Sequence, residues 1–279
     1  MNDMTVNIIV LNWNQKKLSL ECLNSLQKTT YKNKRIVFVD NGSDDGSVDA
    51  VQNLFPKVEI IRSEKNLGYA GGNNFGFKST KNKADYTIFI NNDTYVDPSF
   101  IEPLIYEFEN KPSTVQTVPK IFFADNKKLI WYAGGNVNLT FAQISHRGIR
   151  SKDNEKYNHI RQVGYATGCC FCIRTSDFAA LGMFDENFQM YGEDVDLSLK
   201  VRRSGGNIAF IPKSKIWHHI SSSIGGRYSF SKWKKKYTSI FKLILKYSNP
   251  IFFPITIAFF LFNAFLNFIM VNLLKIFNK

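Results

Sequence analysis

Short runs of β-branched and aromatic residues alternate with segments of helical periodicity along the first 110 residues. The pattern predicts strands over residues 6–11, 35–40, 58–61 and 86–90, and helices over residues 17–26, 44–54, 70–78 and 99–110. Alternation of strands and helices at this spacing is typical of a mostly parallel sheet with crossover helices on its faces. We therefore expect an α/β fold with a Rossmann-like central sheet.

The pattern becomes less regular after residue 115. It predicts strands over residues 115–123, 129–133, 161–173 and 207–217, and helices over residues 175–181 and 193–203. No internal repeat or low-complexity linker interrupts the chain. We expect a single domain in two halves, residues 1–115 and 116–225, followed by a tail over residues 226–279.

The tail combines a basic segment with an apolar one. Lysines and aromatic residues are interleaved over residues 230–247, which is typical of a basic amphipathic helix on anionic lipid. The 20 residues from 255 to 274 carry no charge, and that length just spans a bilayer core of ~30 Å. We expect this segment to form a single transmembrane span, with a hairpin or an in-plane helix as the alternatives. The alternative to membrane attachment is a solvated basic helix followed by a core helix.

Charge is distributed unevenly along the 279 residues. The whole chain has 36 Lys and Arg against 23 Asp and Glu, a net charge of +13. Residues 197–279 hold 14 of the basic residues and none of the acidic ones, so the remainder has 22 against 23, a net charge of −1. A near-neutral body argues against a nucleic-acid-binding protein. We expect the positive tail to keep the body on the cytosolic side of the cytoplasmic membrane.

Two further features bear on the compartment. The N-terminus lacks the basic segment and long apolar run of a signal peptide. Three of the four cysteines crowd into the apolar segment at residues 168–173, with no second ligand pair at a spacing that suits zinc. We therefore expect free, buried thiols.

Four segments, in this order, carry a resemblance to a known family. They are residues 39–47 (VDNGSDDGS), 66–74 (NLGYAGGNN), 91–93 (NND) and 184–206 (FDENFQMYGEDVDLSLKVRRSGG). Together they resemble the inverting GT-A glycosyltransferases of family 2, most closely the rhamnosyltransferase-like branch, over residues 5–225. The resemblance implies transfer of a sugar from a UDP- or dTDP-sugar, a rhamnose-like donor included, with Mg²⁺ or Mn²⁺ as cofactor. The first half would bind the nucleotide-sugar and the second the acceptor.

The expected donor site lies at the carboxyl ends of the strands, where parallel sheets bind ligands. The resemblance assigns Asp40 to the imide N–H of uracil or thymine, although a turn aspartate is the alternative. A glycine-rich turn at residues 66–72 suits a diphosphate at a helix N-terminus, or is simply a tight turn. The expected donor-binding residues are Asn12, Asn14, Asp40, Asn66, Gly68, Gly71, Asn91 and Asn92.

The family's metal-binding motif falls at residues 91–93. Asp93 matches the metal-binding aspartate, while Asn91 replaces an aspartate and removes one negative charge. The resemblance adds His218 as a second metal ligand. It also makes Asp194 the general base that deprotonates the acceptor, with Glu193 orienting or binding the acceptor. Acidic residues are equally favoured at a helix start for structural reasons.

The acceptor is less well defined by the sequence. Candidate acceptor-binding residues are Trp131, Tyr132, Gly168 and Arg202. A basic, lipid-binding tail fits a lipid-linked or cell-surface glycan acceptor.

Two other functions compete with that of a glycosyltransferase. A sugar-1-phosphate nucleotidyltransferase would need a glycine-rich loop after the first strand, where this chain has NWNQKKL. An inactive nucleotide-sugar-binding membrane scaffold is favoured by Asn91 but not by Asp93 and Asp194.

Overall fold

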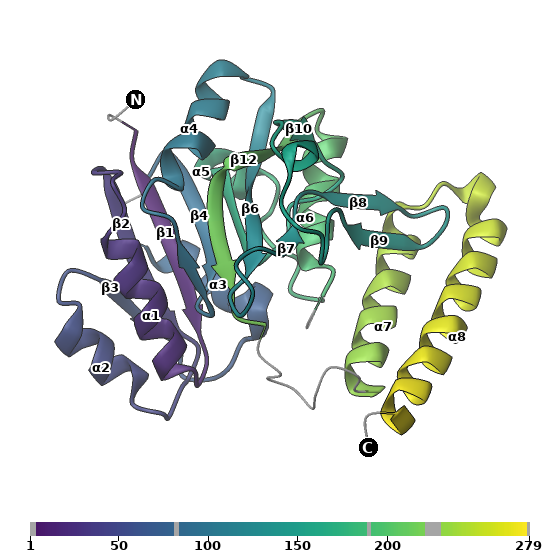
Figure 1. Ribbon diagram of the computed structural model, residues 1–279, viewed down its shortest axis with the longest axis horizontal. Coiled ribbons are helices and arrows are strands. Elements are labelled where there is room, and N and C mark those ends of the chain that lie inside the picture. Colours follow the sequence, from purple (N-terminus) through teal and green to yellow (C-terminus); the bar gives the residue numbers. More distant parts are fainter. Residues whose placement is uncertain (1–3, 81–83, 189–190, 221–229, 278–279) are drawn as a thin grey trace.

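The computed structural model describes residues 4–80, 84–188, 191–220 and 230–277. Its first half is a run of parallel strands joined by helices, in the spatial order β4-β1-β2-β3 (Figure 1). The strands are β1 (Val6–Asn12), β2 (Lys34–Asp40), β3 (Glu59–Arg62) and β4 (Tyr86–Asn91). The helices that connect them are α1 (Lys16–Gln27), α2 (Ser47–Leu54) and α3 (Gly68–Ser79).

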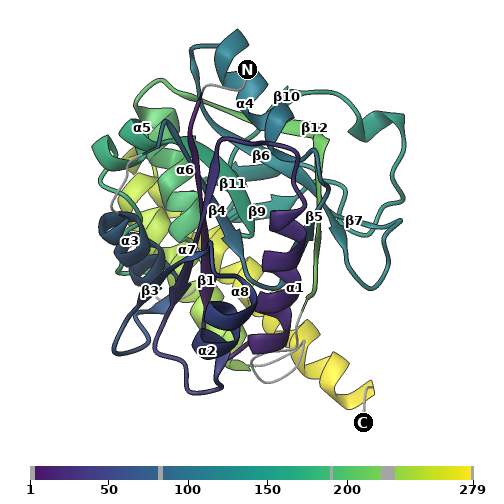
Figure 2. The ribbon, with the colours of Figure 1, turned by 90° about the vertical axis from the view of Figure 1, so that its left-hand side faces the viewer.

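Helices cover both faces of this sheet, and Figure 2 shows α1 and α3 on opposite sides of β1. Glycines let α3 lie unusually close to the strands. A Cβ on Gly72 would come within 2.6 Å of Leu11 Cδ1, and one on Gly76 would collide with Val39. The glycine-rich segment therefore serves helix–sheet packing, and its first turn is held near the ends of β1 and β2.

The second half extends the same sheet with strands of mixed direction. In the described residues the sheet has ten strands in the order β10-β12-β6-β11-β4-β1-β2-β3, with β5 paired to β12 and β7 to β6. These added strands are β5 (Thr94–Val96), β6 (Thr114–Phe123), β7 (Ile130–Tyr132), β10 (Arg161–Gln162), β11 (Cys170–Arg174) and β12 (Asn207–His218). The helices are α4 (Ile101–Asn110), α5 (Thr175–Ala180) and α6 (Glu193–Arg203). The α/β fold expected from the sequence is confirmed, and all four cysteines are free and buried.

The largest differences from the predicted boundaries occur at residues 161–173 and 44–54. Residues 161–173 do not form one strand, because Ala166 N donates to Ser198 Oγ and Gly168 N donates to Asp194 Oδ2 instead of to a neighbouring strand. The helix predicted over residues 44–54 begins only at Ser47. Its start is delayed because Gly46 has a φ of 73° and Asp45 Oδ1 accepts a hydrogen bond from Ser47 N.

The sequence analysis missed a hairpin formed by β8 (Gly135–Asn138) and β9 (Gln143–His146). It reaches from the sheet towards the C-terminal helices (Figure 1). At its tip Phe141 O accepts a hydrogen bond of 2.8 Å from Asn263 Nδ2. The hairpin thereby becomes one of the contacts that join the body to the tail.

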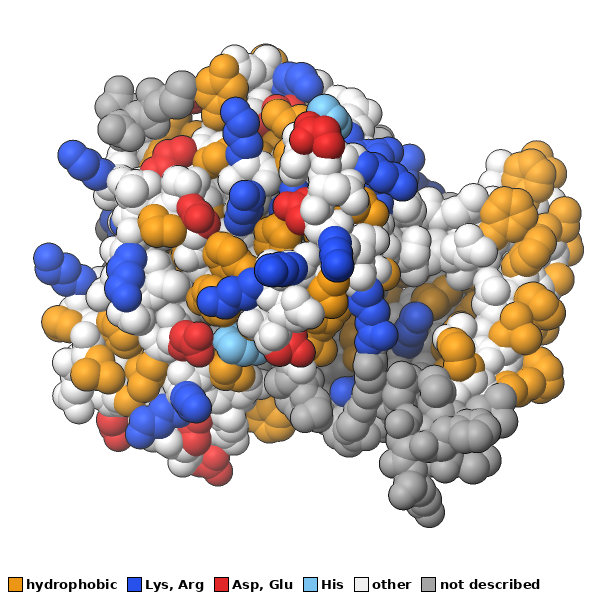
Figure 3. All heavy atoms as spheres, in the orientation of Figure 1, with side chains coloured by type: hydrophobic (Ala, Val, Ile, Leu, Met, Phe, Trp, Pro, Cys, Tyr) orange, Lys and Arg blue, Asp and Glu red, His pale blue; other side chains and the backbone are white. Residues whose placement is uncertain are grey.

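The tail folds into α7 (Phe230–Tyr247) and α8 (Phe253–Phe277), which pack side by side. Short 3₁₀ turns lie at Glu155–Tyr157 and Pro250–Phe252. Tyr237, Ile240 and Ile244 of α7 form a small apolar core with Ala264 of α8. The outer face of α8 stays exposed and apolar, as the space-filling view shows (Figure 3). In the part of the chain that the structure describes, one stretch, Pro250–Met270, is long and apolar enough to cross a membrane.

Candidate active site

A cleft of about 1670 Å³ runs from the carboxyl ends of β1 and β4 to the inner face of α7. The start of α6 and the β8–β9 hairpin complete its walls. Most of the residues singled out in the sequence meet here, although they come from both halves of the chain. Those that line the cleft are Asn14, Asn66, Gly68, Asn91, Asn92, Asp93, Trp131, Gly168, Glu193, Asp194 and His218.

Asn12 lies beneath the cleft floor and joins the strand ends. Its Nδ2 donates to Asp40 Oδ1 at 3.1 Å and to two serine hydroxyls, and its Oδ1 accepts from Asn92 Nδ2 at 3.0 Å. The side chain is completely buried. Asn12 thus fixes the ends of β1, β2 and β4 relative to one another and does not itself line the cleft.

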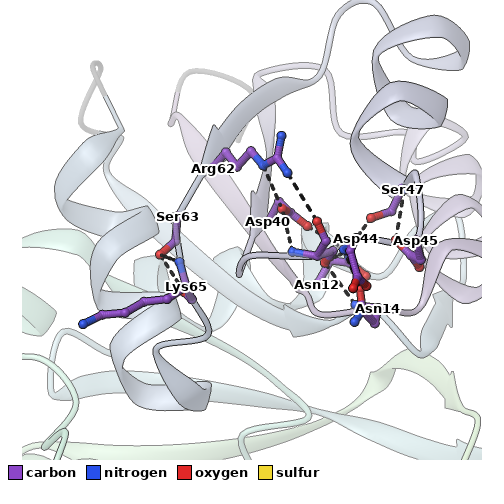
Figure 4. Close-up of polar contacts among 10 residues, drawn as sticks. Asn12, Asn14, Asp40, Asp44, Asp45, Ser47, Arg62, Ser63 and Lys65 are labelled. Carbon is purple, nitrogen blue, oxygen red and sulfur yellow. Dashed lines mark hydrogen bonds and ion pairs between the residues drawn. The ribbon is translucent and has the colours of Figure 1, made fainter.

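Asp40 is buried beside it (Figure 4). Its Oδ2 accepts a hydrogen bond of 3.1 Å from Ser43 N and lies 3.6 Å from Arg62 Nε. Asp40 therefore holds the turn after β2 and, like Asn12, lies below the cleft surface. The neighbouring Asn14 does line the cleft, with a φ of 51° that is supported by a hydrogen bond from Asp44 N to Asn14 Oδ1.

The glycine-rich turn divides into two parts. Asn66 Oδ1 accepts from Gly68 N at 2.8 Å and from Asn41 Nδ2 at 3.0 Å, so Asn66 holds the turn that leads into α3 at the cleft edge. Asn41, which the sequence analysis did not select, also lines the cleft. Gly71 faces away from it, because a Cβ there would meet Leu67 and Glu186.

Asp93 and His218 form a close pair at the centre of the cleft. His218 Nε2 lies 3.1 Å from Asp93 Oδ1, and β5 brings them together by pairing with β12. His218 Nδ1 is buried and has no hydrogen-bond partner among the described residues. A buried polar atom without a partner is costly, so the Asp93–His218 pair is suited to a ligand.

This pair fits a divalent cation. Mg²⁺ takes one or two carboxylates and completes its coordination with water and substrate phosphates, and Mn²⁺ accepts oxygen and imidazole ligands. No group of three or more His, Cys, Asp or Glu residues suitable for a metal occurs in the described part of the chain. A cation at Asp93 and His218 would thus depend on a substrate for its remaining ligands.

Glu193 and Asp194 begin α6 on another side of the cleft. Asp194 Oδ2 accepts from Gly168 N at 2.9 Å, and Oδ1 accepts from Val195 N at 2.8 Å. Glu193 Oε2 has no partner among the described residues. Burial raises the pKa of both carboxyls, and the charge of Asp194 raises that of Glu193 further. Backbone N–H groups stabilise the Asp194 carboxylate, so Asp194 is the member of the pair that ionises first.

Gly168 connects this pair to the donor side of the cleft. Its carbonyl oxygen accepts a hydrogen bond of 2.5 Å from Tyr69 Oη, while its N–H donates to Asp194. A Cβ at this position would lie 3.0 Å from Tyr69 Oη and 3.5 Å from Asp194 Cβ. Gly168 therefore sets the position of the Asp194 carboxylate. Tyr69 was not singled out in the sequence, since nothing in the local pattern indicated this long-range contact.

Aromatic rings form the wall between the metal-binding pair and the hairpin. The Trp131 ring forms T-shaped pairs with the rings of His218 and His146, with ring centroids 4.7 Å and 4.5 Å apart. Burial lowers the pKa of His146 to about 4, so this imidazole is neutral at pH 7. Tyr132 is buried behind Trp131 and donates to Tyr165 O. Arg202 lies exposed in the last turn of α6 and does not line the cleft.

A mixed, mostly parallel sheet flanked by helices, with polar side chains at the strand ends beside one cleft, is the arrangement of a GT-A-like fold. The chain belongs to glycosyl transferase family 2, whose family model matches residues 7–182.

Curated relatives support this assignment. An N-acetylglucosaminyl-diphospho-decaprenol L-rhamnosyltransferase of Mycobacterium tuberculosis is 26% identical over 226 residues, which cover 73% of this chain and 72% of that protein. The O-antigen biosynthesis protein RfbC of Myxococcus xanthus is 27% identical over 208 residues, which cover 71% of this chain but only 16% of the relative.

Solved structures share the fold. GalNAc-T7, crystallised with UDP, GalNAc and Mn²⁺, superposes with a TM-score of 0.71 at 19% identity, covering 88% of this chain and 48% of that one. A mannosyltransferase from Pyrobaculum calidifontis, in complex with GDP-Man and Mn²⁺, has a TM-score of 0.63 at 15% identity, covering 91% of this chain and 68% of that one. At these identities the likeness concerns the fold alone.

Proposed function

We propose that this glycosyltransferase moves a sugar, with inversion, from a UDP- or dTDP-sugar to a lipid-linked or cell-surface glycan at the cytosolic face of the cytoplasmic membrane. A rhamnose-like donor is the first candidate, since the rhamnosyltransferase relative matches nearly three quarters of both chains. The observation that carries the proposal is the placement of the Asp93–His218 pair and the Glu193–Asp194 pair in one cleft.

The division of labour follows from the positions of these residues. Residues 1–115 supply most of the donor side, including Asn14, Asn66 and Asn91. Residues 116–225 supply the carboxylate pair and the aromatic wall, and residues 226–279 supply the membrane-associating tail. Trp131 lines the cleft, and an aromatic ring at this position suits contact with a sugar.

Asp194 acts as the general base in this proposal. Its carboxylate accepts the proton of the acceptor hydroxyl as that oxygen forms a bond to the anomeric carbon, and the bond from that carbon to the nucleoside diphosphate breaks on the opposite side. One base and one displacement give inversion. A raised pKa matches this role, because a base near the working pH transfers protons most effectively. Glu193, neutral beside it, positions the acceptor.

Asp93 and His218 would hold Mg²⁺ or Mn²⁺. The ion would neutralise the charge that develops on the departing diphosphate. Asn91, at the cleft edge, carries no charge and contributes a carboxamide that can bond a ribose hydroxyl.

The tail would attach the enzyme to the membrane as a hairpin that lies along the surface. Trp233 Nε1 donates to Ala264 O and Tyr237 Oη donates to Asn263 O, so α7 runs antiparallel to α8 at close range. If α8 crossed the bilayer, the lysines of α7 would be drawn into hydrocarbon at about 2.5–3.5 kcal/mol each. With both helices at the interface, the apolar face of α8 meets the acyl chains and the lysines meet anionic headgroups.

Release of free nucleotide from a panel of UDP-, dTDP- and GDP-sugars tests the proposed function. Detergent-solubilised protein would be assayed with Mg²⁺, Mn²⁺ or EDTA, beside the isosteric variants Asp93→Asn and Asp194→Asn and the control Asp49→Asn on the exposed side of α2. We expect slow, metal-dependent hydrolysis of one donor that Asp93→Asn abolishes and Asp49→Asn leaves intact.

Two results would contradict the proposal. Absence of binding to every nucleotide would rule out the donor site. Donor binding without turnover, even with glycan-lipid acceptors, would instead indicate an inactive nucleotide-sugar-binding scaffold.

A further inference from the structure

The cleft wall that α7 provides is basic. Lys232, Lys235 and Lys236 line the cleft together with Ser239 and Leu243, and this spacing of three and four residues defines one face of a helix. The helix therefore presents this face to the cleft, while Ile244 packs against α8 and Tyr237 contacts both the cleft and α8.

No carboxylate in the described part of the chain neutralises the positive charges on this face. None of Lys232, Lys235 and Lys236 forms an ion pair with a described carboxylate, whereas Lys246 near the end of the same helix pairs with Asp185 and Asp196. The chain has no acidic residue after Asp196. Lys236 is accessible from the cleft, yet the protein atoms around it lower its pKa by desolvation. An anion bound at this face would offset the desolvation and stabilise the charged form of these ammonium groups.

The same wall continues into an apolar surface. Asn267 and Met270 of α8 line the cleft beyond the lysines, and the exposed face of α8 carries Leu261, Phe262 and Phe265. A ligand that joins a phosphate to a lipid chain would contact both surfaces at once. A nucleotide-sugar donor has no apolar chain, and its diphosphate has a place at Asp93 and His218.

We propose that Lys232, Lys235 and Lys236 bind the phosphate or diphosphate group of a lipid-linked sugar acceptor and thereby hold its sugar against Asp194. The inference rests on the proposed function, since it presumes that the donor occupies the strand ends. It assigns α7 a part in acceptor recognition in addition to its contact with the membrane.

Binding of farnesyl diphosphate, a short prenyl diphosphate, tests this site directly. Affinities for farnesyl diphosphate, for farnesol and for the donor's nucleoside diphosphate would be measured on solubilised protein carrying Lys235→Ala and Lys236→Ala, singly and together. Lys234→Ala is the matched control, because Lys234 lies on the same helix but outside the cleft. We expect each cleft variant to lose about tenfold in affinity for farnesyl diphosphate, the size of one charged hydrogen bond, with farnesol and nucleotide binding unchanged.

Three outcomes would overturn the inference. An equal loss with Lys234→Ala would indicate general electrostatic attraction. A loss of nucleotide affinity in the cleft variants would show that the lysines hold the donor diphosphate. No loss in the double variant would show that the lysines bind no phosphate.

Failure of the proposed function would look different. In that case the unaltered protein would bind no nucleotide and hydrolyse no donor, whatever its affinity for the prenyl diphosphate.

Discussion

His218 Nε2 lies 3.1 Å from Asp93 Oδ1, and the antiparallel pairing of β5 with β12 sets this distance by placing His218 opposite Thr94. The adjacent His219 points elsewhere, with its Nε2 3.4 Å from Glu21 Oε1. The two histidines therefore face different carboxylates despite being neighbours in sequence.

Replacement of His218 should weaken activation by metal. We expect His218→Ala to raise the Mg²⁺ or Mn²⁺ concentration for half-maximal donor hydrolysis by about tenfold or more. Loss of a residue that only hydrogen-bonds to a metal ligand already changes metal affinity about 10–100-fold, so loss of a ligand should have at least this effect. His219→Ala is the control and should leave the metal titration unchanged. Equal effects of the two substitutions would remove His218 from the metal site.

The two carboxyls at the start of α6 should contribute unequally to catalysis. Asp194→Asn should lower kcat by about 10²–10⁴-fold, the usual contribution of a general base. Glu193→Gln should retain most of kcat, because the buried Glu193 is already neutral and glutamine keeps its shape. In the unaltered enzyme, kcat/KM should fall on acidification at a pH above 3.8, the ordinary pKa of aspartate, because burial raises the pKa of Asp194. A reversed order of the two variants would make Glu193 the base.

Glu193 should also make stability depend on pH. Its pKa is raised on folding from an ordinary value of 4.5, so the folded protein holds a proton that the unfolded chain releases. Folding stability is therefore lost as pH rises from about 4.5 through the raised pKa, by about 1.4 kcal/mol per unit of pKa shift. Glu193→Gln cannot ionise, so its melting temperature should rise relative to the unaltered protein between pH 5 and 9. Glu109→Gln, at an exposed position on α4, controls for the lost charge. A difference in melting temperature between Glu193→Gln and the unaltered protein that does not change with pH would contradict this expectation.

The fold could be predicted from the sequence because the hydrophobic pattern of its strands and helices is strongly periodic. Buried strands such as Val6–Asn12 and the helix at Glu193–Arg203 have local patterns that tertiary contacts do not override. The β8–β9 hairpin was missed because its strands are only four residues long and carry the polar, weakly alternating segments GNVN and QISH.

The site was predictable where a motif coincides with a strand end, as at Asp93, and less so where contacts are long-range. Gly71 and Arg202 match motifs, yet helix geometry turns them away from the cleft. No local signal places Tyr69, His146 or the α7 lysines at the cleft, since the folding of distant segments brings them there.

The tail should depend on one ion-pair network for its attachment to α6. Lys246 Nζ lies 2.7 Å from Asp196 Oδ1 and 2.8 Å from Asp185 Oδ2, and Tyr247 Oη donates to Asp196 Oδ1 at 2.7 Å. Asp196 is fully buried two residues after Asp194, and its Oδ2 also lies 3.3 Å from Lys200 Nζ. Loss of Lys246 would leave Lys200 as the remaining ion-pair partner of Asp196 among the described residues, so its charge would be less well compensated. We expect Lys246→Met to lower the free energy of unfolding by ~1–2 kcal/mol, discounted because Lys246 is partly exposed. Denaturant unfolding of solubilised protein measures this, with exposed Lys234→Met as control. Equal stability of the two variants would show that the network does not hold the tail.

The two ends of α8 should lie on the same side of the membrane. A hairpin along the surface keeps both ends of α8 on the side of the catalytic body, whereas a span of the 21 residues Pro250–Met270 separates them. Single cysteines at Asn249 and Asn272 would report on the two ends, and the four native cysteines, all buried, give little background. In sealed inverted membrane vesicles, which expose the cytosolic face, we expect a membrane-impermeant maleimide to label both Asn249→Cys and Asn272→Cys. Labelling of Asn272→Cys only after the vesicles are opened would establish that α8 crosses the membrane. In that case α7 and α8 would have to separate, because the paired arrangement would bury the lysines of α7 in hydrocarbon.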